Sequence, residues 1–143
     1  MRTNRIALAS SFLLVAMAAM INIACDVGTT GADKVIASTK AGEMNISVAS
    51  AAGELKHGEN ELYLAFADAS GNGVDVGAAS LSFHMPAMIG MAEMNDVAAL
   101  TTTELAGRYR AHVTIEAAGT WEAIVNYQGA HGQGQVRMSV NAR

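Results

Sequence analysis

The chain has 143 residues, of which 51% are hydrophobic and 5% aromatic, and its nine basic and thirteen acidic residues give a net charge of −4. This length suits a single domain. Once residues 1–24 are set aside, seven basic and thirteen acidic residues leave a net charge of −6. This balance argues against nucleic acid or an anionic membrane surface as the partner, because both attract basic patches.

Residues 1–24 have the pattern of a bacterial export signal. Arg2 and Arg5 precede an apolar run that ends in small residues before Cys25. The sequence INIAC (21–25) resembles a lipoprotein signal, although Asn22 replaces the usual aliphatic residue. A single cysteine cannot form an internal disulfide, and lipidation explains its presence. We therefore expect a lipoprotein anchored at Cys25; the alternative is an uncleaved anchor, because about 20 apolar residues can span a bilayer.

Both alternatives place the rest of the chain outside the bacterial inner membrane. Asp26, directly after Cys25, resembles the signal that retains lipoproteins at this membrane, so we expect a lipid-anchored protein on its periplasmic side. Residues 25–42 are rich in Gly, Ala and Thr and have no sustained apolar period, which predicts a lipid-anchored tether. The folded domain is then expected over residues 43–143.

From residue 44 onward, apolar and polar side chains alternate with a period of two, which is typical of half-buried strands. The alternation predicts seven strands, at about 44–49, 60–68, 76–85, 96–103, 108–116, 120–127 and 136–140. Outside the signal no segment has helical periodicity. Seven short strands separated by turns predict an all-β, immunoglobulin-like β-sandwich, although its Cys…Trp…Cys hallmark is absent. Trp121 is expected to anchor the core.

Four methionines recur at three-residue spacing after the third predicted strand, and a histidine precedes them: His84, Met85, Met88, Met91 and Met94. Thioether sulfur is soft and carries no titratable proton, so such a cluster beside an imidazole suits Cu(I) better than hard cations. These five residues are therefore the candidate copper ligands. The alternative is that the methionines fill an irregular gap at one end of the core.

Strand parity separates these candidates. Met85 shares a face with the apolar Phe83, so it can be a core residue as readily as a ligand, whereas His84 faces the other way. The other three methionines follow Pro86 in a loop. There, three-residue spacing places side chains on one face only in a 3₁₀ or polyproline-like backbone.

The other histidines are sorted by topology. If strands alternate in direction, the loop with His57 lies at the same end as the methionine loop, His131 lies at the opposite end, and His112 points outward from mid-strand. His57 is then the one further histidine expected near the methionines. The same alternation, counted from Glu43 as the start of the first strand, places the methionine loop away from the membrane anchor.

The order of several short motifs resembles the YtkA-like or FixH-like family of small exported domains. These motifs are MPAM (85–88), Met91, GRY (107–109) and AGTW (118–121), and the resemblance covers about residues 44–141. It implies an immunoglobulin-like sandwich that occurs as a lipoprotein, near respiratory oxidase assembly, or fused to metal-efflux adaptors. It also implies a copper-linked role for Met85, Met88 and Met91, to which local chemistry adds Met94 and His84.

Two functions from different classes follow. The first is a periplasm-facing copper-binding lipoprotein that holds or relays Cu(I) through its methionine-rich loop. The second is a metal-free interaction or assembly module that docks a respiratory or efflux membrane complex through the same apolar loop. An enzyme is not expected, because the sequence shows no histidine–carboxylate or cysteine–histidine arrangement and no glycine-rich phosphate loop.

Overall fold

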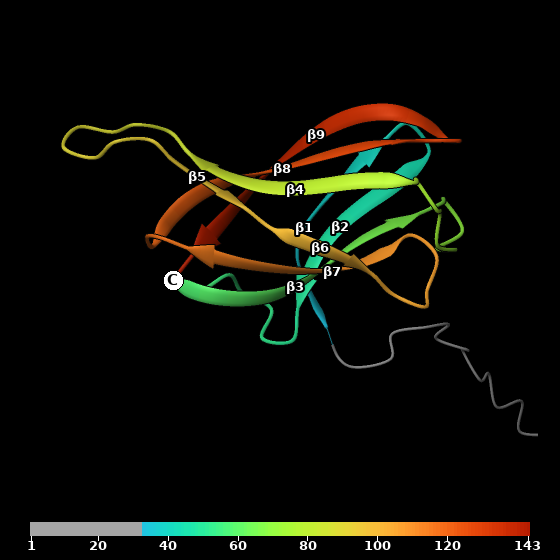
Figure 1. Cartoon of the computed structure of the whole chain (residues 1–143), viewed down its shortest axis with the longest axis horizontal. Coiled ribbons are helices and arrows are strands. Elements are labelled where there is room, and N and C mark those ends of the chain that lie inside the picture. Colours follow the sequence, from blue (N-terminus) through green and yellow to red (C-terminus); the bar gives the residue numbers. More distant parts are fainter. Residues whose placement is uncertain (1–32) are drawn as a thin grey trace, which may run out of the picture.

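The computed structural model describes residues 33–143, so the predicted signal, Cys25 and the first part of the predicted tether lie outside it. The described residues form nine strands and no helix, and hence no helix long and apolar enough to cross a membrane. Two antiparallel sheets stack as layers (Figure 1). The strands are β1 (Lys34–Ala41), β2 (Met44–Ser50), β3 (Gly58–Ala67), β4 (Ala78–Met85), β5 (Met94–Val97), β6 (Ala99–Thr102), β7 (Arg108–Ile115), β8 (Gly119–Gly129) and β9 (Gly132–Ala142).

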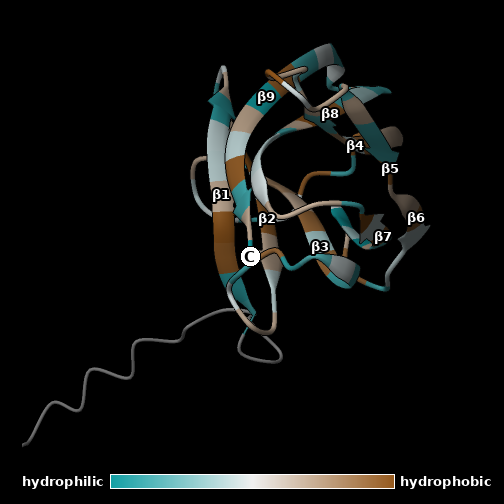
Figure 2. Cartoon of the chain, turned by 90° about the vertical axis from the view of Figure 1, so that its left-hand side faces the viewer, coloured by the Kyte–Doolittle hydropathy of each residue, from teal (hydrophilic) through white to brown (hydrophobic). Residues whose placement is uncertain are grey.

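The strand order confirms the predicted all-β, immunoglobulin-like sandwich. One sheet has the order β1-β2-β3-β7-β6 and the other β5-β4-β8-β9. Without the outer strands β1 and β5, this is the arrangement of an immunoglobulin domain, in which the first, second, fifth and fourth strands face the third, sixth and seventh. The edges are covered, because β1 also contacts β9 and β5 continues directly into β6 (Figure 2).

The core lies between the two layers and is built from the inward residues that the alternation predicts. Trp121, Phe66 and Phe83 are its largest fully buried side chains, and the indole Nε1 of Trp121 donates a hydrogen bond to the Ala117 carbonyl, 2.9 Å away. The expectation that Trp121 anchors the core is therefore confirmed. Full burial of a Phe, Leu, Ile, Val or Met side chain in this core stabilises the fold by about 1.5–3 kcal/mol, because apolar area is removed from water.

Strand β1 corrects the predicted tether, because the sandwich begins at Lys34 and not at residue 43. A β-bulge between Val35 and Ala37 explains why the pattern hides this strand. Ile36 and Ala37 both pack against the core although they are adjacent, while Val35 is 60% exposed. A bulge places two residues opposite one and so interrupts the alternation on which the prediction depends.

The predicted strand at 96–103 is two strands in different sheets. β5 pairs with β4, whereas β6 pairs with β7 across the sandwich. The buried Ala98 marks the crossing, and its amide donates to the Leu81 carbonyl, 3.0 Å away. Period-two alternation cannot reveal a change of sheet, so the expected count of seven strands is wrong; residues 33–143 form nine.

The start of the described chain is fixed on the outer face of the five-stranded sheet. Lys34 lies opposite Ser50, the last residue of β2, so the expectation that the chain enters at Glu43 is wrong. The strand count from Glu43, which placed the methionine loop away from the membrane anchor, is therefore wrong as well. Arg108 of β7 pairs with Asp33, and its guanidinium carbon Cζ lies 4.3 Å from the centre of the Tyr63 ring.

Candidate metal-binding hairpin

The methionine loop is the tip of a long β-hairpin formed by β4 and β5, and it projects beyond one end of the sandwich (Figure 1). Met88 and Met91 exchange two backbone hydrogen bonds, with N–O distances of 3.0 and 2.9 Å. Ile89 and Gly90 form the turn between them, and Gly90 has a φ of 82°, which favours glycine. The backbone is therefore a hairpin and not the 3₁₀ or polyproline-like segment considered from the sequence.

Hairpin register arranges the four methionines as two cross-strand pairs. Met85 lies opposite Met94, and Met88 lies opposite Met91. Residues that lie directly opposite each other project from the same face of the ribbon, with their Cβ atoms about 4.5–5.5 Å apart. The three-residue spacing in the sequence therefore places the methionines in two cross-strand pairs.

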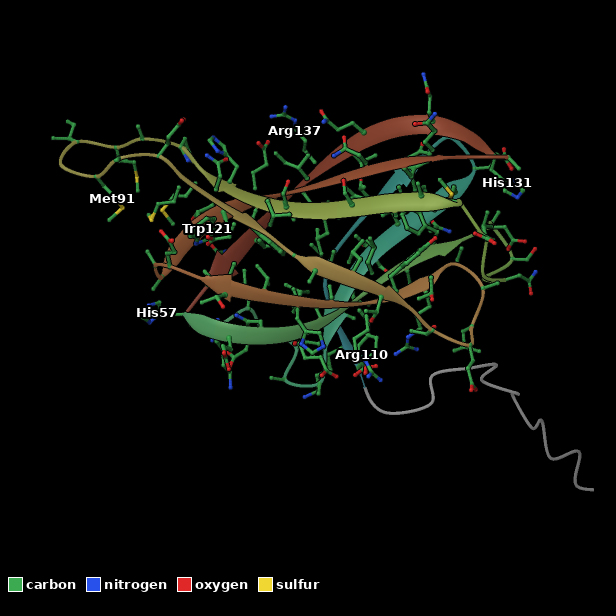
Figure 3. The ribbon with its side chains drawn as sticks, in the orientation of Figure 1. His57, Met91, Arg110, Trp121, His131 and Arg137 are labelled. Carbon is green, nitrogen blue, oxygen red and sulfur yellow. The ribbon has the colours of Figure 1, made fainter. Side chains whose placement is uncertain are left out.

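The two pairs differ in exposure. The Met85 side chain is fully buried in the core, and Met94 is half-buried and packs against it. The side chains of the outer pair are exposed, at 55% for Met88 and 42% for Met91. Figure 3 shows Met91 on the hairpin beyond the end of the sandwich, while Trp121 lies in the body of the domain. Of the four, only Met88 and Met91 present a freely accessible thioether.

His84 lies on the outer face of β4, as strand parity predicts. It pairs across the hairpin with Asn95 of β5, and its Nδ1 lies 2.9 Å from the Asn95 Oδ1. It also borders a groove of about 520 Å³ on the outer face of the four-stranded sheet. The groove is lined by His84, Pro86, Met88, Thr120, Trp121, Glu122, Arg137, Met138 and Ser139. His84 and Met88 thus border the same groove.

The sequence prediction missed the polar wall of this groove. Arg137 on β9 and Glu122 on β8 form an ion pair with an Nη1–Oε2 distance of 3.0 Å, and Figure 3 shows Arg137 on the outside of β9. Alternation along β8 and β9 places both residues outward. They lie beside His84 because the strands are ordered β4-β8-β9, and no motif in the sequence predicts that order.

The remaining histidines lie as the topology predicts. Figure 3 shows His57 at the same end as Met91 and His131 at the other end. His57 belongs to the loop before β3, where its backbone amide donates to the Arg143 carbonyl, 2.8 Å away, and it does not line the groove. His112 points outward from β7, with its Nε2 3.8 Å from the Glu61 Oε2. The hairpin therefore has His84 as its neighbouring imidazole.

Nitrogen, oxygen and thiolate ligands do not gather elsewhere in the described region. Residues 33–143 contain no group of three or more His, Cys, Asp or Glu side chains placed to hold a metal ion. A site for a hard or borderline cation such as Ca²⁺ or Zn²⁺ requires such a group. The hairpin instead carries methionine thioethers and one imidazole, which are ligand types that soft ions such as Cu(I) prefer.

Comparison with known proteins places this domain in a family. No curated protein and no solved structure among those compared matches the chain. The model of the YtkA-like family matches residues 37–126, from within β1 to β8, and covers the whole methionine hairpin. The chain is therefore a member of the YtkA-like family.

Proposed function

We propose that this protein binds Cu(I) at its methionine hairpin and holds it for transfer to another protein. The observation that carries the proposal is the outer pair, Met88 opposite Met91, which presents two methionines outside the core on the hairpin that also carries His84, and His84 borders the same groove as Met88. In this assignment Met88, Met91 and His84 are the ligands. Met94, at the base of the hairpin, is a reserve ligand, and Met85 supports the hairpin from within the core.

The chemistry of the donors suits transfer more than storage. Each thioether is a neutral, weak ligand for a soft ion, so the ion can pass to a partner one bond at a time. The exposure of Met88 and Met91 lets an acceptor approach while the ion is still held. Thioethers also cannot be lost to disulfide formation, which threatens a cysteine site in an oxidising compartment.

The location we propose is the periplasmic side of the bacterial inner membrane, with a lipid anchor at Cys25. This rests on the export pattern of residues 1–24 and on the isolated cysteine. Because the sandwich begins at Lys34, the tether is shorter than predicted. The chain from Cys25 to Asp33 extends at most about 26–29 Å, which holds the domain close to the membrane and to a copper-handling, respiratory or efflux complex there.

A second candidate function is supported by one observation at the hairpin tip. Ile89 is fully exposed (108%) between the two accessible methionines. An apolar tip of this kind also suits a metal-free module that docks a membrane complex, because exposed apolar side chains are common at interaction sites. In that case the methionines provide adaptable surface and no ligands.

A competition titration separates the two functions. The full chain carries Cys25→Ser, so that its thiol cannot bind copper, and is kept in a mild detergent while it competes with a chromogenic Cu(I) chelator. We expect one Cu(I) per chain, and at least about tenfold weaker binding when Met88 and Met91 are both replaced by leucine. Because leucine keeps volume and apolarity, the double variant should lose less than about 1.5 kcal/mol of folding stability.

Met44→Leu is the matched control, since Met44 is a half-buried methionine that lines a pocket with His131 at the opposite end. Its Cu(I) affinity should equal that of the parent. Equal affinity in the parent and in the double variant would reject the copper function. A parent chain that binds no Cu(I) would leave the metal-free module as the function.

A further inference from the structure

A hydrogen bond across the hairpin determines which nitrogen of His84 is left without a partner. His84 and Asn95 lie directly opposite each other on β4 and β5, and the His84 Nδ1 is 2.9 Å from the Asn95 Oδ1. Strand register holds both side chains on the outer face of the four-stranded sheet. The contact is therefore built into the hairpin and does not depend on a mobile loop.

The chemistry of the two groups sets the tautomer. An amide oxygen can only accept a hydrogen bond, so the Nδ1 of a neutral His84 must carry the proton. The lone pair is then on Nε2, the nitrogen on the other side of the ring. Within residues 33–143 the His84 ring has no second hydrogen-bond partner. The Nε2 lone pair is thus free for a metal ion, and His84 borders the groove that Met88 also lines.

We propose that Asn95 is a positioning residue for copper: it holds the His84 ring and its tautomer so that Nε2 completes a site with Met88 and Met91. This inference rests on the proposed copper function and assigns a role that the methionine motif does not contain. In many metal sites the second nitrogen of a ligating histidine donates to a protein oxygen in this way. Loss of that partner lowers metal affinity about 10–100-fold.

The test measures the ¹⁵N NMR signals of the His84 imidazole in the full Cys25→Ser chain, kept in mild detergent. Ag(I) is the probe, because it is soft and monovalent like Cu(I) but stable in air. His84→Gln assigns the resonances. We expect the metal-free chain to show His84 protonated at Nδ1, and Ag(I) to shift Nε2 together with the Met88 and Met91 methyl groups.

Two variants at Asn95 separate positioning from packing. Asn95→Leu removes the acceptor, so we expect mixed tautomers and Ag(I) binding weaker by about tenfold or more. Asn95→Asp retains an oxygen acceptor and should restore the tautomer and most of the affinity. The matched control is Asn126→Leu, which removes an amide from the same sheet face but bonds Ser80 and Gln135, away from the hairpin. It should leave both readouts unchanged.

The outcomes separate the role of Asn95 from the copper function on which it rests. Methionine shifts without an Nε2 shift, or a metal-free His84 protonated at Nε2, would overturn the role of Asn95 and leave the copper function standing. If Ag(I) moves neither methionine nor histidine signals, the copper function itself is rejected and the role of Asn95 falls with it. The NMR titration of the chain with Asn95 in place decides between these outcomes even if an Asn95 variant misfolds.

Discussion

Two methionine pairs on one hairpin have the same residue type and the same register but different surroundings. Met85 and Met94 pair where the hairpin lies over the sandwich, and Met85 is fully buried. Met88 and Met91 pair three residues further on, where the hairpin has left the sandwich, and both are exposed. Pro86 follows directly after the last residue of β4 and, lacking an amide hydrogen, cannot continue the ladder.

This contrast shows that the spacing of a motif does not assign one role to its members. The same thioether packs a core in one pair and offers a lone pair to a soft ion in the other. The position of the sandwich edge decides between them. Substitutions confined to one pair should therefore leave the role of the other intact.

The largest expected effect is on stability, from truncation of the inner pair. Met85→Ala should lower the free energy of unfolding by about 2–5 kcal/mol, because it leaves a cavity in a packed core. Met88→Ala and Met91→Ala should change it by no more than about 0.5 kcal/mol, as is usual for exposed positions. Chemical denaturation measures all three. Similar losses in the three variants would show that the outer pair is also structural.

A backbone change at the tip should affect the outer pair alone. Gly90→Ala places a Cβ at a φ of 82° with no neighbour within 4 Å, so its cost is strain of about 1–2 kcal/mol at the turn. We expect the Met88–Met91 pairing to loosen and Cu(I) affinity to fall. Gly71→Ala is the matched control, with a φ of 87° and equally open surroundings in another turn. If both variants bind Cu(I) like the parent, the turn does not organise the site.

Stability should respond to alkaline pH through Tyr109, which is remote from both pairs. Burial, and then the charge of Asp75, raise the pKa of this phenol, whose hydroxyl donates to the Gly77 carbonyl at 2.9 Å. In the unfolded chain the pKa of tyrosine is about 10. The folded state is therefore most stable below that pH and loses stability as pH rises above it, because the unfolded state releases its proton first.

Tyr109→Phe should remove this alkaline dependence and cost about 0.5–1.5 kcal/mol at neutral pH for the lost hydrogen bond. Denaturation midpoints of the two chains between about pH 8 and about pH 11 provide the measurement. A slope that persists in the variant would mean that another group is responsible.

The smallest expected effect is at acidic pH. The backbone amide and side chain of Asn72, together with the amides of Ser70 and Gly71, lower the pKa of Asp68. Its contribution to stability is present above the unfolded pKa of about 3.9 and is lost as pH falls through the lower folded value. Asp68→Asn should flatten this acid loss without changing copper binding at neutral pH. Acid titration followed by circular dichroism would show whether the two chains differ.

Most of the sandwich could be predicted from the sequence, because strands with one buried face alternate by residue. The facing of Met85, His84 and Trp121, and the placement of His57 and His131 at opposite ends, all follow from parity and from alternating strand directions. The exceptions have physical causes. A bulge conceals β1, and a crossing at Ala98 divides one predicted strand between two sheets.

The candidate site was less predictable than the fold. The methionines and His84 stand out by residue type, but their pairing depends on hairpin register. From the spacing alone, the methionines would share one face only in a 3₁₀ or polyproline-like backbone. Asn95 carries no signal in the sequence. It gains a role only because β4 and β5 place it opposite His84. Contacts set by strand pairing need the structure, whereas contacts set by periodicity do not.

The central claim is that copper is held by the outer methionine pair with His84. X-ray absorption at the copper edge, on the Cys25→Ser chain loaded with one equivalent of Cu(I), tests it most directly. We expect a nearest shell of two sulfurs and one imidazole nitrogen, and loss of the sulfur scattering when Met88 and Met91 become leucine. A shell of nitrogen and oxygen alone, or sulfur scattering that persists in the double variant, would contradict it.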